Sequence, residues 1–170
     1  MLTLETLKAR FNYDPETGIF TRIMRSDVRP CWNSRYADKP AGTISATTGY
    51  VNLNIDKRLY RAHRLAWLYV YGTWPDGELD HKNLDRLDNR ISNLRQATSG
   101  QNRANTRKQS NNTSGYKGVT RFRYGNVYKW RARINKNRTE IVLGYYDRLE
   151  EAHNAYSNAA QKFYGEFARV

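Results

Sequence analysis

A long polar stretch, residues 76–110, interrupts a chain that is otherwise regularly patterned with apolar side chains. It passes into "RKQSNNTSG", whose Ser, Asn and Gly content is typical of a loop or linker. A chain of 170 residues can form one domain or two compact modules. We therefore place a domain boundary in this linker, which divides the chain into residues 1–109 and 110–170.

The first module is predicted to be a scaffold of short helices and a β-meander. Apolar residues at helical spacing open the chain and lead through a turn at 14–18 into a strand; they are Leu4, Leu7 and Phe11. Alternating apolar residues between 41 and 60 predict the β-meander, with a turn near Asp56–Lys57; they are Val51, Leu53, Ile55 and Leu59. A second helix over "HRLAWLYVYG" is expected to stop at Gly72 and to pack one apolar side, made of Leu65, Leu68 and Tyr69.

The second module is predicted to be a sheet on a helix. Three strands are expected in "YKGVTRF", "VYKWRARI" and "TEIVLGYY", and a helix in "RLEEAHNAYSNAAQKFYG". One face of that helix is apolar: Ala152, Ala155, Tyr156, Ala159 and Phe163. The fold class of the chain is therefore predicted as α+β, with a three-stranded antiparallel sheet packed on one helix at its C-terminal end.

The charge of the chain favours a nucleic-acid partner. Lys and Arg number 29 against 16 acids, so the formal net charge is +13 and the pI is near 10.0. The single cysteine, Cys31, excludes an intramolecular disulfide and a Cys-rich zinc site. Since no apolar run is typical of a signal peptide or a membrane span, we expect a cytoplasmic protein. Monomer and homodimer both stay open.

The polar stretch itself carries residues suited to phosphodiester hydrolysis, a reaction that needs a nucleophilic water and neutralisation of phosphate charge. Asp80 is expected to end a strand, and His81 to point to the opposite face of the pleat. His81 can be neutral at physiological pH and accept a proton from water. Asn102 follows 21 residues after His81, where Ser99 could cap a helix that carries it.

The combination of "DH", "DNRISNLR" and "QN" resembles the HNH nuclease motif, a hairpin followed by a helix around one metal ion, here over about 77–108. The resemblance implies that Asp80 and Asn102 bind the cation, that His81 is the general base and that Asn93 holds the loop so that His81 is correctly aimed. Asn102 replaces a histidine, as in HNN members typical of phage and intron-borne homing enzymes. Such oxygen ligands favour Mg²⁺, with Mn²⁺ tolerated, over Zn²⁺.

Other polar residues of the first module and the last helix are expected to have structural rather than catalytic roles. Asn83 and Asn89 are interpreted as turn residues that cap and bridge backbone groups. His63 is expected to make a structural hydrogen bond rather than touch a phosphate, and His153 lies on the polar side of the last helix.

A basic strip is predicted on the sheet of the second module. On its middle strand Tyr128, Trp130, Ala132 and Ile134 alternate with Lys129, Arg131 and Arg133, so one face packs on the helix and the other is cationic. Arg121 and Arg123 are expected to extend this strip. The segment "SGYKGVTRF…KWRARI…LGYY" and the helix after it resemble the AP-two (ethylene-response-factor) DNA-binding domain over about 55 residues. Lys117 retains charge, whereas Glu140 and Val142 stand where plant domains carry Arg and Trp, so the resemblance implies DNA positioning and leaves base reading open.

Together these features predict a site-specific, homing-type endonuclease of double-stranded DNA, and "FNYDPETGIF" with "HRLAWLYVYG" resembles the scaffold of freestanding phage HNH enzymes. Two alternatives remain. One is a DNA-binding regulator whose HNH segment is non-catalytic. The other is an RNA-binding protein with exposed aromatic sheet residues, which is disfavoured because the aromatic side of the middle strand is needed against the helix.

Overall fold

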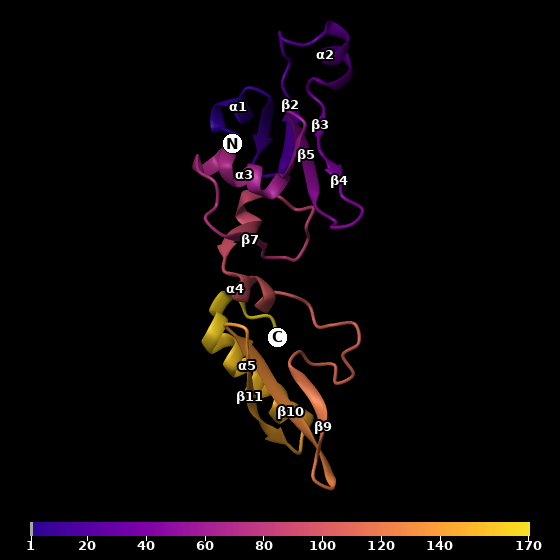
Figure 1. Cartoon of the computed structure of the whole chain (residues 1–170), viewed down its shortest axis with the longest axis vertical. Helices are drawn as coiled ribbons and strands as arrows, with labels where there is room; N and C mark the ends of the chain where they lie inside the picture. The colour runs from indigo at the N-terminus through magenta and orange to yellow at the C-terminus, as the bar shows by residue number, and fades with distance from the viewer. Residues whose placement is uncertain (1) are drawn as a thin grey trace. The chain divides into compact units, whose positions relative to one another are not determined.

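The computed structural model describes residues 2–170, which fall into two compact units. Unit 1 ends at Gln96 and unit 2 runs Ala97–Val170 (Figure 1). The predicted domain boundary after residue 109 lies in the loop that follows the first helix of unit 2. Helices and strands are mixed in each unit, and the expected α+β class is confirmed.

Unit 1 consists of short elements arranged in small sheets around its helices. In chain order they are α1 Leu4–Lys8, β1 Phe11–Asp14, β2 Ile19–Arg22, α2 Pro30–Tyr36, β3 Pro40–Ala41, β4 Thr43–Ile44, β5 Val51–Ile55, β6 Arg58–Arg61, α3 Ala62–Tyr71, β7 Glu78–His81, the 3₁₀ turn η1 Ile91–Asn93 and β8 Leu94–Ala97. They form a sheet β1-β2-β3, a sheet β4-β5-β6 and a two-stranded sheet β7-β8. The last of these carries the Asp80–His81 pair.

The core of unit 1 lies between α3 and the first two sheets. Leu65, Phe20 and Leu53 are almost completely buried within it. The predicted end of α3 at Gly72 is confirmed, since this glycine adopts a left-handed conformation that closes the helix. Phe11 was expected on the first helix, but it begins β1 because it alternates with Tyr13 on the buried side of a strand.

The expected turn at Asp56–Lys57 is confirmed. Both residues have positive φ, 51° and 64°, the conformation of a two-residue hairpin turn that matches the twist of the flanking strands. β5 and β6 are therefore paired in the register that buries Leu53 and Ile55.

Unit 2 is a three-stranded antiparallel sheet packed on a long helix, as predicted. Its elements are α4 Ser99–Ala104, β9 Val119–Tyr124, β10 Val127–Lys136, β11 Thr139–Tyr146, α5 Leu149–Tyr164 and η2 Gly165–Phe167. The strand order is β11-β10-β9, and α5 lies along this sheet in Figure 1. The buried side chains at the interface are Val119, Ala132, Ile134, Ala152, Tyr156 and Ala160.

The start of α4 differs by one residue from the expectation. Thr98, not Ser99, is the N-cap: its hydroxyl accepts from the Gln101 backbone N–H, and the Gln101 side chain accepts from the Thr98 N–H. This reciprocal pair satisfies two backbone donors, which a cap at Ser99 could not do without a Gln or Glu three residues later. Across residues 2–170, no helix is long and apolar enough to cross a membrane.

One glycine of unit 2 is required for the packing of α5 on the sheet. Gly118 has a φ of 71°, and a Cβ at this position would lie 2.1 Å from the buried ring of Tyr156. Gly125 has a similar φ of 60° but nothing within 4 Å. The two positions therefore share the backbone constraint and differ in the space available.

We expect Gly118→Ala to destabilise the protein by about 2–5 kcal/mol, since strain of the left-handed backbone adds to overpacking. Gly125→Ala, the matched control, should cost only about 1–2 kcal/mol. Denaturant unfolding of both variants measures the difference, and equal destabilisation would contradict the close approach of Tyr156.

Candidate active site

Asp80 and His81 lie next to each other at the end of β7, and both are buried, with 3% and 5% of their surface exposed. Arg95 on the neighbouring strand β8 places its Nε and one terminal nitrogen 2.9 Å from Oδ2 of Asp80. A carboxylate taken out of water is costly unless it is paired in this way. The ion pair therefore fixes Asp80 and joins the two strands of the sheet.

The ring of His81 is held by the side chain of Asn89, with 3.4 Å between Nε2 and Oδ1. Because an amide oxygen only accepts hydrogen bonds, Nε2 is the protonated nitrogen in this contact, and the lone pair of the neutral ring lies on Nδ1. Burial lowers the pKa of His81 below its usual value, and the contact with Asn89 offsets only part of that effect. The geometry therefore favours a neutral imidazole with one defined tautomer.

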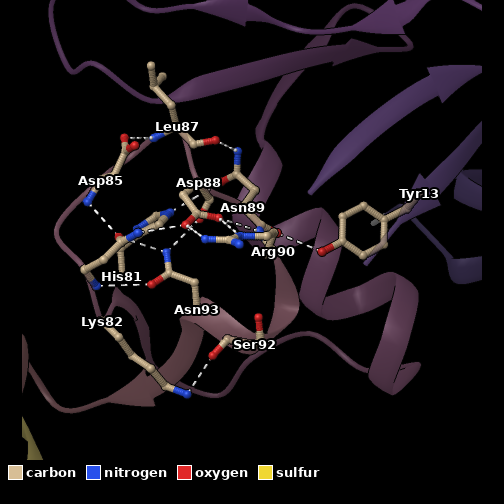
Figure 2. Close-up of polar contacts among 11 residues, drawn as sticks. Tyr13, His81, Lys82, Asp85, Leu87, Asp88, Asn89, Arg90, Ser92 and Asn93 are labelled. Atoms are coloured by element: carbon tan, nitrogen blue, oxygen red, sulfur yellow. Dashed lines mark hydrogen bonds and ion pairs between the residues drawn. The ribbon is translucent and has the colours of Figure 1, made fainter. Parts of the chain in front are cut away.

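Asn93 closes the loop that follows β7 (Figure 2). Its Nδ2 donates to Oδ1 of Asn83, at 3.0 Å, and to the carbonyl of Asp88, at 2.8 Å. Its Oδ1 accepts from the backbone N–H of Asn83, at 3.1 Å. One buried carboxamide therefore connects both ends of the loop, while its role in aiming His81 stays a prediction.

The inside of this loop is a polar network centred on Asp88. Arg90 donates from Nε and NH2 to its two carboxylate oxygens, at 2.8 and 2.6 Å, and Asn83 donates to Oδ2 at 2.7 Å. The hydrogen bonds from Arg90 are the main reason that the pKa of Asp88 falls to about 2. The carboxylate therefore remains ionised and keeps the loop closed at any pH near neutral.

The N-terminal hairpin of unit 1 fixes the position of Asn89. The hydroxyl of Tyr13 on β1 donates to the carbonyl of Asn89 at 2.7 Å, and burial raises the pKa of this tyrosine (Figure 2). Gly18, in the turn after β1, is so close that a Cβ would lie 2.5 Å from the nitrogen of Arg90. The hairpin therefore supports the residue that orients His81.

Asn89 and Tyr50 are site residues that the sequence did not reveal. Asn89 was interpreted as a turn residue that bridges backbone groups, and its Nδ2 does donate to the carbonyl of Leu87 at 3.1 Å, but its Oδ1 also contacts the ring of His81. Tyr50 precedes β5, and its ring centroid lies 5.9 Å from that of His81. Asn89 lies in the segment that resembles the HNH motif, but the resemblance gave it no contact with His81, and no motif includes Tyr50. Only the folding of β5 and the loop against β7 brings these side chains together.

His63 on α3 is a further member of the site. It is 4% exposed, and its ring centroid lies 5.1 Å from that of His81 and 5.0 Å from that of Tyr50. A structural hydrogen bond was expected, but Nδ1 has no hydrogen-bond partner among residues 2–170. Burial is the main cause that lowers the pKa of His63 to about 3, and electrostatic interactions with His81, Arg61 and Arg64 lower it further.

The predicted metal ligands lie in different units, Asp80 on β7 of unit 1 and Asn102 on α4 of unit 2. The described residues contain no group of three or more His, Cys, Asp or Glu side chains suited to a metal ion. The predicted set has one carboxylate and one amide, so it would not form such a group. Its cation-binding role stays a prediction.

On the outer face of the unit 2 sheet, the basic residues of β10 are partly neutralised. Lys129 lies 3.2 Å from Asp147 and Arg133 lies 2.6 Å from Glu140. Arg131 lies over the ring of Phe122, 4.9 Å from its centroid. Lys129, Arg131 and Arg133 therefore share one face, as predicted by their alternation. Among these three residues, only Arg131 has no acidic partner within residues 2–170.

The expectation that Arg121 and Arg123 extend this strip is wrong. The register of β9 against β10 places Arg121 opposite Trp130 and Arg123 opposite Tyr128, on the face that also carries the helix-packed residues. Directly paired residues of adjacent strands share a face, so these arginines point away from Lys129 and Arg131. A one-residue difference in register, which the sequence alone leaves open, decides this.

Aromatic side chains from the flanking strands occupy the outer face instead. Phe122 and Tyr124 on β9 lie 5.2 and 5.0 Å from Tyr145 on β11, between ring centroids. The RNA-binding alternative was disfavoured because the aromatic side of the middle strand packs on the helix. That reason holds for β10, but the face as a whole is both aromatic and cationic.

Lys117 is engaged within unit 2. Its ammonium donates to the carbonyls of Ala104 and Thr106, at 2.5 and 2.9 Å, at the C-terminal end of α4. Burial lowers the pKa of Lys117 to about 8. The predicted DNA contact of Lys117 stays a prediction, while the observed role is to hold α4.

In a comparison with known protein families, the chain matches the HNH endonuclease family over residues 60–104. The matched region begins at the end of β6 and includes α3, β7, the loop closed by Asn93, β8 and α4. The match supports an HNH nuclease in this part of the chain. It includes His63 as well as Asp80 and His81.

The low pKa of His63 predicts a pH dependence of stability. The ordinary value is 6.5 and the folded value is about 3, so the unfolded chain binds more protons between these limits. The contribution of the neutral His63 ring to the free energy of unfolding is complete above pH 6.5. It is lost progressively as the pH falls toward 3.

We expect His63→Gln to flatten the decline of unfolding free energy between pH 6.5 and 4.5, by up to about 1.4 kcal/mol per pH unit. Urea unfolding of the variant and the parent at several pH values gives the two slopes. An unchanged slope would show that His63 titrates normally in the folded protein.

Proposed function

We propose that this chain is a site-specific, divalent-metal-dependent endonuclease of the homing type that hydrolyses a phosphodiester of double-stranded DNA. One observation carries the proposal: His81 is buried, contacts Oδ1 of Asn89 through Nε2 and directly follows Asp80, in a segment that matches the HNH endonuclease family.

His81 acts as the general base in this proposal. With Nε2 directed to Asn89, the lone pair of Nδ1 accepts a proton from the attacking water. The lowered pKa keeps the ring unprotonated at neutral pH, so the base is ready before substrate arrives. Asn93 acts through the loop and not on the substrate, since its three hydrogen bonds hold residues 83–88.

Asp80 is the proposed metal ligand. Carboxylate oxygen fits a hard cation, and we propose Mg²⁺, with Mn²⁺ tolerated. When bound, such a cation polarises the phosphate and stabilises the leaving oxygen, and the products would be 5′-phosphate and 3′-hydroxyl ends. Arg95 orients Asp80 through Oδ2 and so restricts the direction from which the carboxylate can be approached. The second ligand proposed is Asn102.

Unit 2 would hold the DNA away from the cut. Lys129, Arg131 and Arg133 lie on one exposed or half-exposed face of the sheet, so they can meet phosphates without disturbing the core against α5. Contacts to phosphate fix the position of a protein on DNA without reading bases. A DNA-binding regulator without catalysis, the second candidate function, would use the same surface.

We expect His81→Ala to lower cleavage of supercoiled plasmid in Mg²⁺ by about 10²–10⁴-fold, because the general base is removed. His153→Ala, a histidine of the other unit, is the control and should cleave normally. Gel analysis of nicked and linear products measures both, and EDTA should stop the parent enzyme. Normal cleavage by His81→Ala would refute the base assignment, and no cleavage by the parent would favour the regulator.

A second variant tests the anchoring surface. Replacing Lys129, Arg131 and Arg133 by Gln should weaken binding to duplex DNA and lower the slope of log K against log salt by up to about 0.9 for each phosphate that is no longer neutralised. The matched control, Arg121→Gln with Arg123→Gln, changes the opposite face and should leave the slope nearly unchanged. If the control variant is weakened as much as the test variant, the anchoring role of the outer face is wrong.

A further inference from the structure

Two guanidinium groups share the ring of Tyr50 at the edge of the candidate site. The Cζ atom of Arg61 lies 4.7 Å from the ring centroid, and that of Arg86 lies 4.9 Å from it. The same ring contacts the rings of His63 and His81. Arg61 ends β6, and Arg86 belongs to the loop after β7, so three separate segments of unit 1 meet at one tyrosine.

Neither guanidinium is neutralised by the protein. Within residues 2–170, the acidic side chains that form ion pairs are used by other basic residues, and neither Arg61 nor Arg86 has an acidic partner. Arg86 is fixed by a hydrogen bond of 2.7 Å from NH1 to the carbonyl of Thr48. Both side chains are exposed.

Two like charges held beside one ring repel each other, and a bound anion relieves that repulsion. A guanidinium is also suited to a phosphate, because its planar donors can engage two oxygens at once. The ring of Tyr50 restricts the side chains in advance, so less conformational entropy is lost when the anion binds. The arrangement is therefore prepared for a phosphate group.

We propose that Arg61 and Arg86, ordered by Tyr50, bind a backbone phosphate of the DNA strand that is cut, next to the scissile phosphodiester. The proposal rests on the proposed nuclease function. The centroid of Tyr50 is 5.9 Å from that of His81, and both guanidinium groups lie within 5 Å of the same ring, so a phosphate on these arginines lies in the neighbourhood of the general base. The two arginines are positioning residues, since they touch the substrate backbone and not the reacting atoms.

A purely structural role makes a different prediction. Arg35 and Arg22 also share one ring, that of Tyr36 on α2, with their Cζ atoms 5.4 and 5.6 Å from the centroid, but no histidine pair adjoins that contact. Arg35 is an exposed arginine over a tyrosine in the same unit, and so provides a matched control. If contacts between arginine and tyrosine serve the fold alone, substitutions at Tyr50 and at Tyr36 should have the same effect on DNA binding.

The test uses the full chain in EDTA, which prevents cleavage, with a fluorescent duplex of mixed sequence. We expect Arg61→Gln combined with Arg86→Gln to lower the slope of log K against log salt by about 0.9–1.8, because one or two phosphates are no longer neutralised. Arg35→Gln should retain the parental slope, and Tyr50→Leu should weaken binding in the same direction as the double variant by releasing both arginines. Thermal unfolding of each variant verifies folding.

The outcomes separate this proposal from the nuclease assignment. An unchanged slope in the folded double variant, or an equal decrease in Arg35→Gln, overturns the phosphate site even if the parent protein cleaves plasmid DNA. A lowered slope in the double variant alone supports the site even if the parent never cleaves. In Mg²⁺, the double variant should also cleave more slowly at subsaturating DNA without a change in the pH profile, because the general base is untouched.

Discussion

The site depends on the hydrogen bonds that Asn93 makes inside the loop after β7. A buried polar segment is stable only if its donors and acceptors find partners, and this one carboxamide satisfies three of them. Asp88 and Arg90 complete the network, so the loop keeps one conformation. His81 is the last residue of β7, directly before that loop, so the closed loop fixes the direction of its side chain.

The scaffold of unit 1 has a functional consequence beyond stability. Its N-terminal hairpin holds Asn89 through Tyr13 and Gly18, and Asn89 in turn sets the tautomer of His81. The ring of Tyr50, which contacts His81, also contacts the guanidinium groups of Arg61 and Arg86. Residues outside the segment that matches the nuclease family, Tyr13, Gly18 and Tyr50, therefore position residues within it.

Unit 2 illustrates how strand register decides the use of a charged surface. Basic residues are frequent on β9 and β10, but the pairing of Arg121 with Trp130 divides them between two faces. The register shift opposite Ala132 and Arg133 skips Leu143 of β11, and it places Glu140 on the outer face near Arg133. The outer face combines cations with aromatic rings, and acids neutralise part of its charge.

The α+β class, the end of α3 at Gly72, the β5–β6 turn and the sheet-on-helix unit could be predicted from the sequence, because local periodicity and turn residues act over a few positions. The roles of Asp80, His81 and Asn93 stay predictions. Packing of the folded chain brings Asn89, Tyr50 and His63 around His81, pairs Arg95 with Asp80 and turns Arg121 to the helix side of the sheet. These facts depend on which distant segments pack together and in which register. A linear pattern carries no information on such contacts, since their free energy comes from burial and pairing across the fold.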